Sequence, residues 1–151
     1  MKDVLGAFNQ LQKAYRRYCY QAVALLGIKM SEMLCILYLY NFPKENTAHA
    51  IAQYSQLSPG MVSKSLESLR EAGYVRSQKD EQDNRIYHLY LTEKAQELVK
   101  RLRVAQSYFI SEVAQGISGE EFRQVAEVAE RMLENLAEHP QLGEGARSKE
   151  E

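Results

Sequence analysis

Four small or polar residues share one side of a helix predicted over residues 58–72. Gly60, Ser63, Lys64 and Glu67 lie opposite its apolar positions on a helical wheel. Ser63 could bond to a phosphate or a base edge, Lys64 to phosphate or guanine, and Glu67 to the amino group of cytosine. Gly60 would let the backbone come close to a phosphate near the helix N-terminus. Polar residues that merely face solvent would give the same pattern.

A charged segment follows this helix, and it has three basic residues, Arg76, Lys79 and Arg85, and three acidic ones, Asp80, Glu81 and Asp83. An arginine at the tip of a hairpin can enter the narrow minor groove of DNA, where the potential is strongly negative. Asp83 could hold the guanidinium of Arg85 in a bidentate pair. A solvated turn with a weak surface ion pair is the alternative interpretation.

The helix predicted over residues 58–72 has residues typical of a helix start and of a helix end. Ser58, which we also include among the candidate DNA contacts, is an N-cap residue, and Pro59 suits the first helical position. Gly73 is typical of a helix C-terminus. A short helix over residues 48–55, capped by Thr47, precedes it. The spacing of the two helices predicts a helix-turn-helix.

The charged segment lies between two predicted strands. The first covers residues 74–76, the tip covers residues 77–84, and the second strand covers residues 85–91. Leu89 and Leu91 alternate with His88 and Tyr90, which places the two pairs on opposite faces. A lone hairpin is marginal in water, so we expect it to pack on the helices. Thr92 is predicted to cap the next helix.

The remaining helices are long and carry apolar stripes. We predict helices over residues 4–25, over about 31–40 from Ser31 or a neighbour, over 92–115, and over 118–137 with a Ser118–Glu121 capping box. The first has a heptad seam, whose members are Val4, Phe8, Leu11, Tyr15, Tyr18, Ala22 and Leu25. Such stripes at both ends of the chain favour pairing with a second copy in a symmetric homodimer.

The central segment resembles the MarR family of multiple-antibiotic-resistance-type repressors. The matching residues are Leu57, Ser58, Val62, Ser63, Leu66, Leu69, Gly73, Val75, Asp80, Asp83, Arg85, Leu89, Leu91 and Thr92. The resemblance implies a homodimeric winged-helix regulator on a palindromic operator, with Ser63 and Lys64 at the major groove and Arg85 at the minor groove. It also implies a ligand pocket between the dimerisation helices and the DNA-binding lobe. Asn84 and Ala95 depart from the family's pattern, where a basic residue and a glycine are common.

The predicted fold is mainly α (α+β), a winged helix-turn-helix with about six helices and a two- to three-stranded wing. We expect a single domain over residues 1–139, with dimerisation helices at about 1–27 and 117–138 on either side of a DNA-binding lobe at about 30–100. Residues 140–151 are expected to form a flexible tail.

Composition excludes several classes of protein. The net charge is −1, but residues 1–116 hold 15 Lys and Arg against 11 Asp and Glu, whereas residues 117–151 hold 4 against 9. The predicted DNA-binding part is therefore the basic one. No run of about 18 apolar residues or signal peptide is evident, so we expect a cytoplasmic protein without a membrane partner. The three histidines share no ligand spacing, so no metal is expected. No catalytic set stands out, so we expect neither an enzyme nor a cofactor.

A ligand pocket is predicted among Tyr15, Arg16, Tyr18, Cys19 and Tyr38, which could bind a small aromatic or phenolic effector. Filling of the core or the dimer seam by these residues is the alternative. Cys19 could be a redox-active thiolate beside Arg16, or a small buried apolar residue.

The predicted function is therefore a homodimeric regulator, a repressor of palindromic operators released by a small molecule. Two alternatives remain open at this stage. One is a DNA-binding regulator that senses redox state through Cys19, and the other is a winged-helix protein-interaction module without specific DNA binding.

Overall fold

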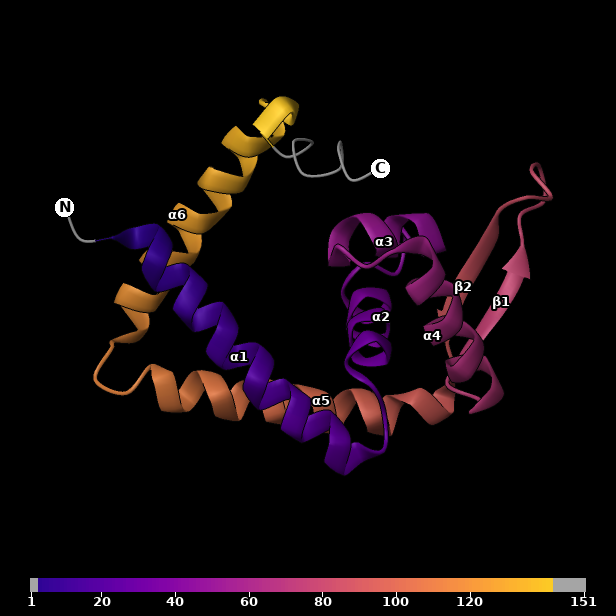
Figure 1. The fold of residues 1–151 in the computed structure, drawn as a ribbon, viewed down its shortest axis with the longest axis horizontal. Helices are drawn as coiled ribbons and strands as arrows, with labels where there is room; N and C mark the ends of the chain where they lie inside the picture. Colours follow the sequence, from indigo (N-terminus) through magenta and orange to yellow (C-terminus); the bar gives the residue numbers. More distant parts are fainter. Residues whose placement is uncertain (1–2, 143–151) are drawn as a thin grey trace, which may run out of the picture. The chain divides into compact units, whose positions relative to one another are not determined.

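The computed structural model describes residues 3–142 of the 151-residue chain (Figure 1). Its elements in order are α1 (Val4–Leu26), α2 (Met30–Asn41), α3 (Ala48–Ser55), α4 (Pro59–Glu71), β1 (Val75–Lys79), β2 (Tyr87–Leu91), α5 (Glu93–Val113), α6 (Gly119–Ala137) and the 3₁₀ turn η1 (Pro140–Leu142). Six α-helices and one antiparallel hairpin confirm the predicted winged-helix class.

Contacts within the chain divide it into two compact units, residues 1–109 and 110–151. The division falls inside α5, because its first half packs into a core and its last turns do not. The single domain that we predicted over residues 1–139 therefore stays a prediction. Residues 140–142 form a 3₁₀ turn rather than irregular tail, and the rest of the predicted tail lies outside the described residues.

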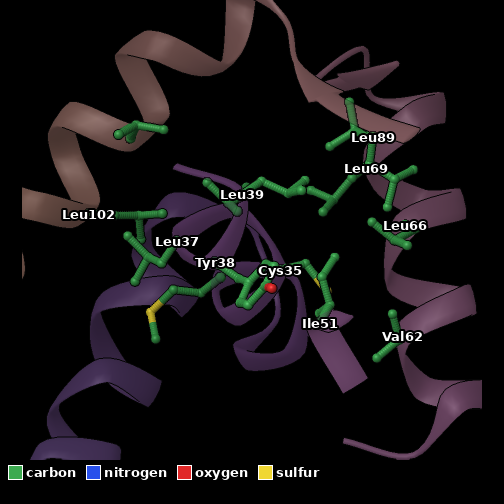
Figure 2. Close-up of a cluster of buried hydrophobic side chains, with 14 of the residues drawn as sticks. Cys35, Leu37, Tyr38, Leu39, Ile51, Val62, Leu66, Leu69, Leu89 and Leu102 are labelled. Atoms are coloured by element: carbon green, nitrogen blue, oxygen red, sulfur yellow. The ribbon is translucent and has the colours of Figure 1, made fainter. Parts of the chain in front are cut away.

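Helix α2 is the centre of the first unit. It is apolar nearly all round, and Met33, Cys35, Ile36, Leu37, Tyr38 and Leu39 are buried. Figure 2 shows Val62, Leu66 and Leu69 of α4 pointing toward these side chains, with Ile51, Leu89 and Leu102 around them. Residues from α1 to α5 and from both strands thus share one core, and this core holds α4 and the hairpin in place.

Helix α2 begins at Met30, a neighbour of Ser31. Lys29, not Ser31, is the N-cap, and its N–H donates to the carboxylate of Glu32 at 2.8 Å. Ser31 lies inside the helix, where its hydroxyl accepts from the hydroxyl of Ser65 on α4 at 2.8 Å. Ser31 therefore links two helices instead of starting one.

Both helices of the helix-turn-helix begin and end as predicted. Thr47 accepts from the N–H of Ala50 at 3.2 Å, and Ser58 accepts from that of Met61 at 3.2 Å. At the end of α4, Gly73 has φ +79°, and Tyr74 donates its N–H to the carbonyl of Leu69 at 2.8 Å. This Schellman motif turns the chain directly from α4 into the hairpin (Figure 1).

Strand β1 extends farther toward the tip than predicted and strand β2 begins later, so the tip is residues 80–86 instead of 77–84. β1 runs to Lys79, and the register pairs Val75 with Leu91 and Ser77 with Leu89. The sheet has two strands, but the N–H of Leu89 also donates to the carbonyl of Asn46 at 2.8 Å. Asn46 thus partly takes the place of a third strand at this edge.

The seam predicted on α1, which could pack within the chain or against a second copy, is only partly covered within the chain: Tyr15, Tyr18 and Ala22 are half-buried. Cys19 and Val23 are the buried positions, whereas Leu25, a predicted member, is 89% exposed. A straight helix drifts by about 20° per heptad relative to a 3.5-residue repeat, so the last predicted positions rotate away from the core. The first half of α1 keeps exposed apolar residues, namely Val4, Leu5, Phe8 and Leu11.

Thr92 directly precedes α5, as predicted, and its carbonyl accepts the N–H of Ala95 at 3.0 Å, but its side chain bonds to another part of the chain. Its hydroxyl donates to the carbonyl of Gly73 at 2.6 Å, and its N–H donates to that of Tyr74 at 3.0 Å. It therefore connects the end of the hairpin to the end of α4. The buried positions of α5 beyond it are Ala95, Leu98, Val99 and Leu102.

The second unit contains α6, which begins with the predicted capping box. Ser118 and Glu121 exchange backbone-to-side-chain hydrogen bonds of 2.8 and 3.2 Å. No residue of α6 is buried, and its apolar stripe is Phe122, Val125, Val128, Met132, Leu133 and Leu136, between 42% and 64% exposed.

Among the described residues, no single helix is long and apolar enough to cross a membrane, although the bent pair α1 and α2 meets the length and composition criteria together.

Candidate nucleic-acid interface

The polar side of α4 is solvent-exposed as predicted. Gly60, Ser63, Lys64 and Glu67 are all exposed, and so is Ser58 at the N-cap. The opposite side is in the core, with Val62 and Leu69 at most 1% exposed. A helix anchored by one face with a polar face free has the form that fits into a major groove.

Two polar contacts hold α4 against its neighbours. The buried hydroxyl of Ser65 donates to Ser31 on α2, which fixes the rotation of α4 about its axis. Arg70 donates to the hydroxyl of Ser77 on β1 at 3.4 Å, at the long end of hydrogen-bond geometry. The position of the exposed face therefore depends mainly on the apolar core and on Ser65.

Arg85 extends from the hairpin tip with 92% of its side chain exposed. Its Nε lies 3.3 Å from Oδ1 of Asp83, and the same oxygen accepts the backbone N–H of Arg85 at 2.9 Å. The predicted bidentate pair is therefore wrong, because only one guanidinium nitrogen and one carboxylate oxygen meet. This exposed pair contributes little to stability, but it leaves the outer nitrogens of Arg85 available to a phosphate or a base edge.

Asp80 is the organising residue of the tip. Its Oδ1 accepts the N–H groups of Gln82 and Asp83, both at 2.8 Å, and its Oδ2 lies 2.8 Å from Nε2 of His88. The hydrogen bond from His88 and the two backbone donors lower the pKa of Asp80 to about 2. Asp80 is thus an anion at neutral pH, and it shapes the loop that presents Arg85.

The two other basic residues of the hairpin lie against aromatic rings. The guanidinium carbon of Arg76 is 4.3 Å from the ring centroid of Tyr90, its partner across the strands. Nζ of Lys79 is 6.0 Å from the ring of Tyr87, at the outer limit of a cation–π contact. Both cations remain exposed, so the hairpin offers Arg76, Lys79 and Arg85 to an anionic partner.

The base of the hairpin contains a contact that the sequence did not indicate. Nζ of Lys94 donates to the carbonyl of Ala72 at 2.6 Å and lies 4.8 Å from the ring of Tyr74. A cation at the C-terminus of α4 complements the partial negative charge there. The two residues are 22 positions apart, so only the Gly73 turn and the Thr92 link together could have suggested it.

The predicted ligand residues are divided between two places. Tyr15 and Tyr18 pack on Phe109 of α5, with ring centroids 5.3 and 5.4 Å apart, and Gln106 donates to the Tyr15 hydroxyl at 2.6 Å. Burial raises the pKa of Tyr15 to about 12, so this hydroxyl stays protonated. Arg16 is exposed.

Tyr38 belongs to a different aromatic group. Its ring lies 5.0 Å from that of Phe42 and 5.2 Å from that of Tyr54 on α3, and its hydroxyl donates to the carbonyl of Glu45 at 3.1 Å. These contacts explain its burial as core packing beside the α2–α3 connection. The five predicted ligand residues are therefore not gathered in one place, and only Tyr15, Tyr18 and Cys19 of them share a face of α1.

Cys19 is 3% exposed, and burial raises the pKa of its thiol. A redox-active thiolate requires the opposite shift. Cys35 on α2 is fully buried with a pKa raised to about 12. Within residues 3–142, no cluster of three or more His, Cys, Asp or Glu side chains could hold a metal ion.

Known proteins match this arrangement in fold. A family model described as a winged helix DNA-binding domain matches residues 33–95. A MarR transcriptional regulator from Methanosarcina mazei Go1 has 22% sequence identity and a TM-score of 0.78, over 91% of this chain and 99% of that chain. A MarR-family regulator from Silicibacter pomeroyi has 22% identity and a TM-score of 0.76, over 85% and 86%.

MepR of S. aureus, in a complex with DNA, is 20% identical with a TM-score of 0.70, over 89% of this chain and 99% of that chain. The matched residues 33–95 run from within α2 to the start of α5, and they include all the candidate DNA contacts described above. The chain therefore contains a winged helix DNA-binding domain, set within the fold of the MarR-type transcriptional regulators.

Proposed function

We propose that the protein is a homodimeric transcriptional regulator that binds palindromic operators in the cytoplasm. The observation that carries the proposal is the common exposure of the polar face of α4 and of Arg85, while the apolar residues behind both are buried. Ser63, Lys64 and Glu67 contact base edges and phosphates in the major groove, with Gly60 and Ser58 at the backbone. Arg85 enters the minor groove, and Arg76 and Lys79 contact phosphates.

A second copy of the chain is needed to cover the exposed apolar faces of the terminal helices. Phe8 and Leu11 on α1 and the stripe of α6 are 42–64% exposed, and each covered side chain of this size contributes about 1.5–3 kcal/mol when fully buried. The same faces on two chains make a symmetric interface. A dimer also places two weakly basic lobes at a fixed separation, which suits two half-sites one helical turn apart.

The effector binds at the cluster of aromatic rings formed by Tyr15, Tyr18 and Phe109. This cluster joins α1 to α5, and a small aromatic or phenolic ligand that separated these rings would move the two helices relative to each other. Because α5 continues directly from the wing, such a movement changes the separation of the lobes and lowers operator affinity. This is the mechanism of a repressor released by its ligand.

The redox alternative is disfavoured, because burial keeps the Cys19 thiol protonated. A protein-interaction module without specific DNA binding is the remaining alternative, and selection of duplexes from a random pool separates it from the proposal. A homodimeric regulator should enrich a palindrome whose half-site centres are about 10 base pairs apart. Enrichment of no sequence would contradict the proposal.

The role of α4 is tested by measuring how tightly Lys64→Ala binds the duplex obtained from this selection. This substitution should weaken binding and reduce the salt dependence, because one cation no longer displaces counterions. Arg101→Ala, which removes an exposed cation from α5 outside the α4 face and the hairpin, is the control and should leave binding unchanged.

A further inference from the structure

Ser65 is the one buried polar side chain on α4 in the part of the chain that the structure describes. It is 4% exposed, and its hydroxyl donates to that of Ser31, in the first turn of α2, at 2.8 Å. The two residues are 34 positions apart in the sequence, so this bond joins two helices. Because Ser65 is shielded from solvent, its hydroxyl depends on Ser31 as a partner.

The place of Ser65 on α4 gives this bond its leverage. With about 100° of turn per residue, Ser65 lies about 100° from Lys64 on the exposed side and about 40° from Leu69 on the buried side. The bond is thus at the edge of the apolar stripe, where it opposes rotation of the helix about its own axis. The hydrophobic effect that holds Val62, Leu66 and Leu69 has no preferred direction, whereas a hydrogen bond requires a set distance and angle.

The rotation of α4 decides which way its exposed polar residues point. Ser63 and Lys64 directly precede Ser65, and Glu67 follows it by two positions. At a helix radius of about 5–6 Å, a rotation of about 20° moves the tip of a side chain by about 2 Å. A hydrogen bond to a base edge does not survive a displacement of this size, whereas the attraction of a flexible lysine to phosphates does.

We propose that Ser65 is a positioning residue that, through Ser31, fixes the rotation of α4 and thereby sets the sequence specificity of DNA binding. The bond ties the exposed face of α4 to α2, the helix at the centre of the core. Loss of the bond therefore lowers discrimination between sequences more than it lowers affinity for DNA in general. This inference rests on the proposed function, and it names a buried residue on which the specificity of that function depends.

The test compares the full parent chain with Ser31→Ala, Ser65→Ala and the double variant. Fluorescence anisotropy at constant ionic strength measures the affinity of each protein for the duplex selected by the parent and for duplexes with single base-pair changes in the half-sites. The ratio of these affinities is the discrimination, and it should fall by about threefold to tenfold in all three variants, the effect of one hydrogen bond. Affinity for an unrelated duplex should change little, because no cation has been removed.

Urea unfolding separates a positioning role from a merely structural one. Ser31→Ala leaves α4 unchanged but should lower stability, because the buried hydroxyl of Ser65 loses its acceptor. Adding Ser65→Ala should recover most of this loss, because no hydroxyl is then left without a partner. Discrimination should nevertheless stay low in the double variant. A double variant with the discrimination of the parent would overturn the inference, because the apolar core alone would then set the rotation.

Ser55→Ala is the matched control. The Ser55 hydroxyl donates to the carbonyl of Ile51 at 2.5 Å within α3, so this variant removes a half-buried serine hydroxyl from the same helix-turn-helix without removing a bond between helices. It should keep the discrimination of the parent, and an equal loss in this variant would overturn the inference.

The outcomes distinguish this inference from the proposed function. A parent chain that enriches no sequence would overturn both. A parent chain that enriches a sequence, which the double variant then discriminates equally well, would overturn the inference alone.

Discussion

The hydroxyl of Thr92 donates to the carbonyl of Gly73 over 2.6 Å, which joins the residue after β2 to the glycine two residues beyond the end of α4. The Thr92 N–H bonds to the next carbonyl, that of Tyr74. The hairpin therefore begins and ends at one point, and its direction relative to α4 is set by these two bonds.

Thr92→Val should destabilise the lobe by about 1 kcal/mol, because the Gly73 carbonyl loses its donor while the β-branched shape is kept. Urea unfolding followed by circular dichroism measures this change. Thr92→Ser is the control and should retain most of the stability. Equal stability of the parent and the valine variant would mean that water replaces the hydroxyl without cost.

Arg85→Ala should weaken operator binding by about tenfold, as expected for one minor-groove arginine. Its ion pair with Asp83 is exposed, so folding and the dimer should be unaffected. Anisotropy with the selected duplex gives the affinity, and sedimentation velocity gives the oligomeric state. If the variant binds the operator as tightly as the parent does, Arg85 of the hairpin tip does not contribute to the DNA interface.

Features governed by short-range rules could be predicted from the sequence. Ser58, Pro59 and Gly73 start and end α4 because capping depends on residues within one turn of the helix end. The exposed face of α4 follows from its 3.6-residue period, and the core stripe of Val62, Leu66 and Leu69 follows from the same period.

Features that depend on contacts between residues far apart in the sequence could not be predicted from the sequence. Asn46 and His88 are 42 positions apart, and no local pattern relates them. The Arg76–Tyr90 contact depends on the strand register, which in turn depends on a tip shorter than the polar run indicated. A strict heptad predicts Leu25 on the seam of α1, but Leu25 is 89% exposed, because the apolar stripe of a helix with 3.6 residues per turn drifts relative to a seven-residue repeat.

Leu133→Glu should convert the proposed dimer to monomers, because it places a charge in the apolar stripe of α6 that a second copy would cover. Operator affinity should then fall by about a hundredfold or more, since two linked lobes bind far more tightly than one. Sedimentation velocity measures the oligomeric state, and fluorescence anisotropy measures the affinity for the operator.

Glu134→Gln, a neighbouring exposed position outside the stripe, is the control for this substitution and should remain dimeric. Circular dichroism checks that the Leu133 variant is still helical. A helical Leu133→Glu protein that is still a dimer would mean that the α6 stripe faces something other than a second copy.

Acid should loosen the hairpin tip through Asp80. The pKa of this carboxyl falls from an ordinary 3.8 to about 2 in the folded chain, with the His88 contact as the largest cause. A group whose folded pKa is lowered stabilises the fold above its unfolded pKa, and this contribution disappears as pH falls through the folded value.

Asp80→Asn should therefore be less stable than the parent at pH 5, and the difference should shrink between about pH 4 and pH 2. Urea unfolding of both proteins across this range measures it, with Asp3→Asn at the N-cap of α1 as a carboxylate control outside the hairpin. A difference that stays constant down to pH 2 would show that the Asp80 carboxylate acts through its shape and not through its charge.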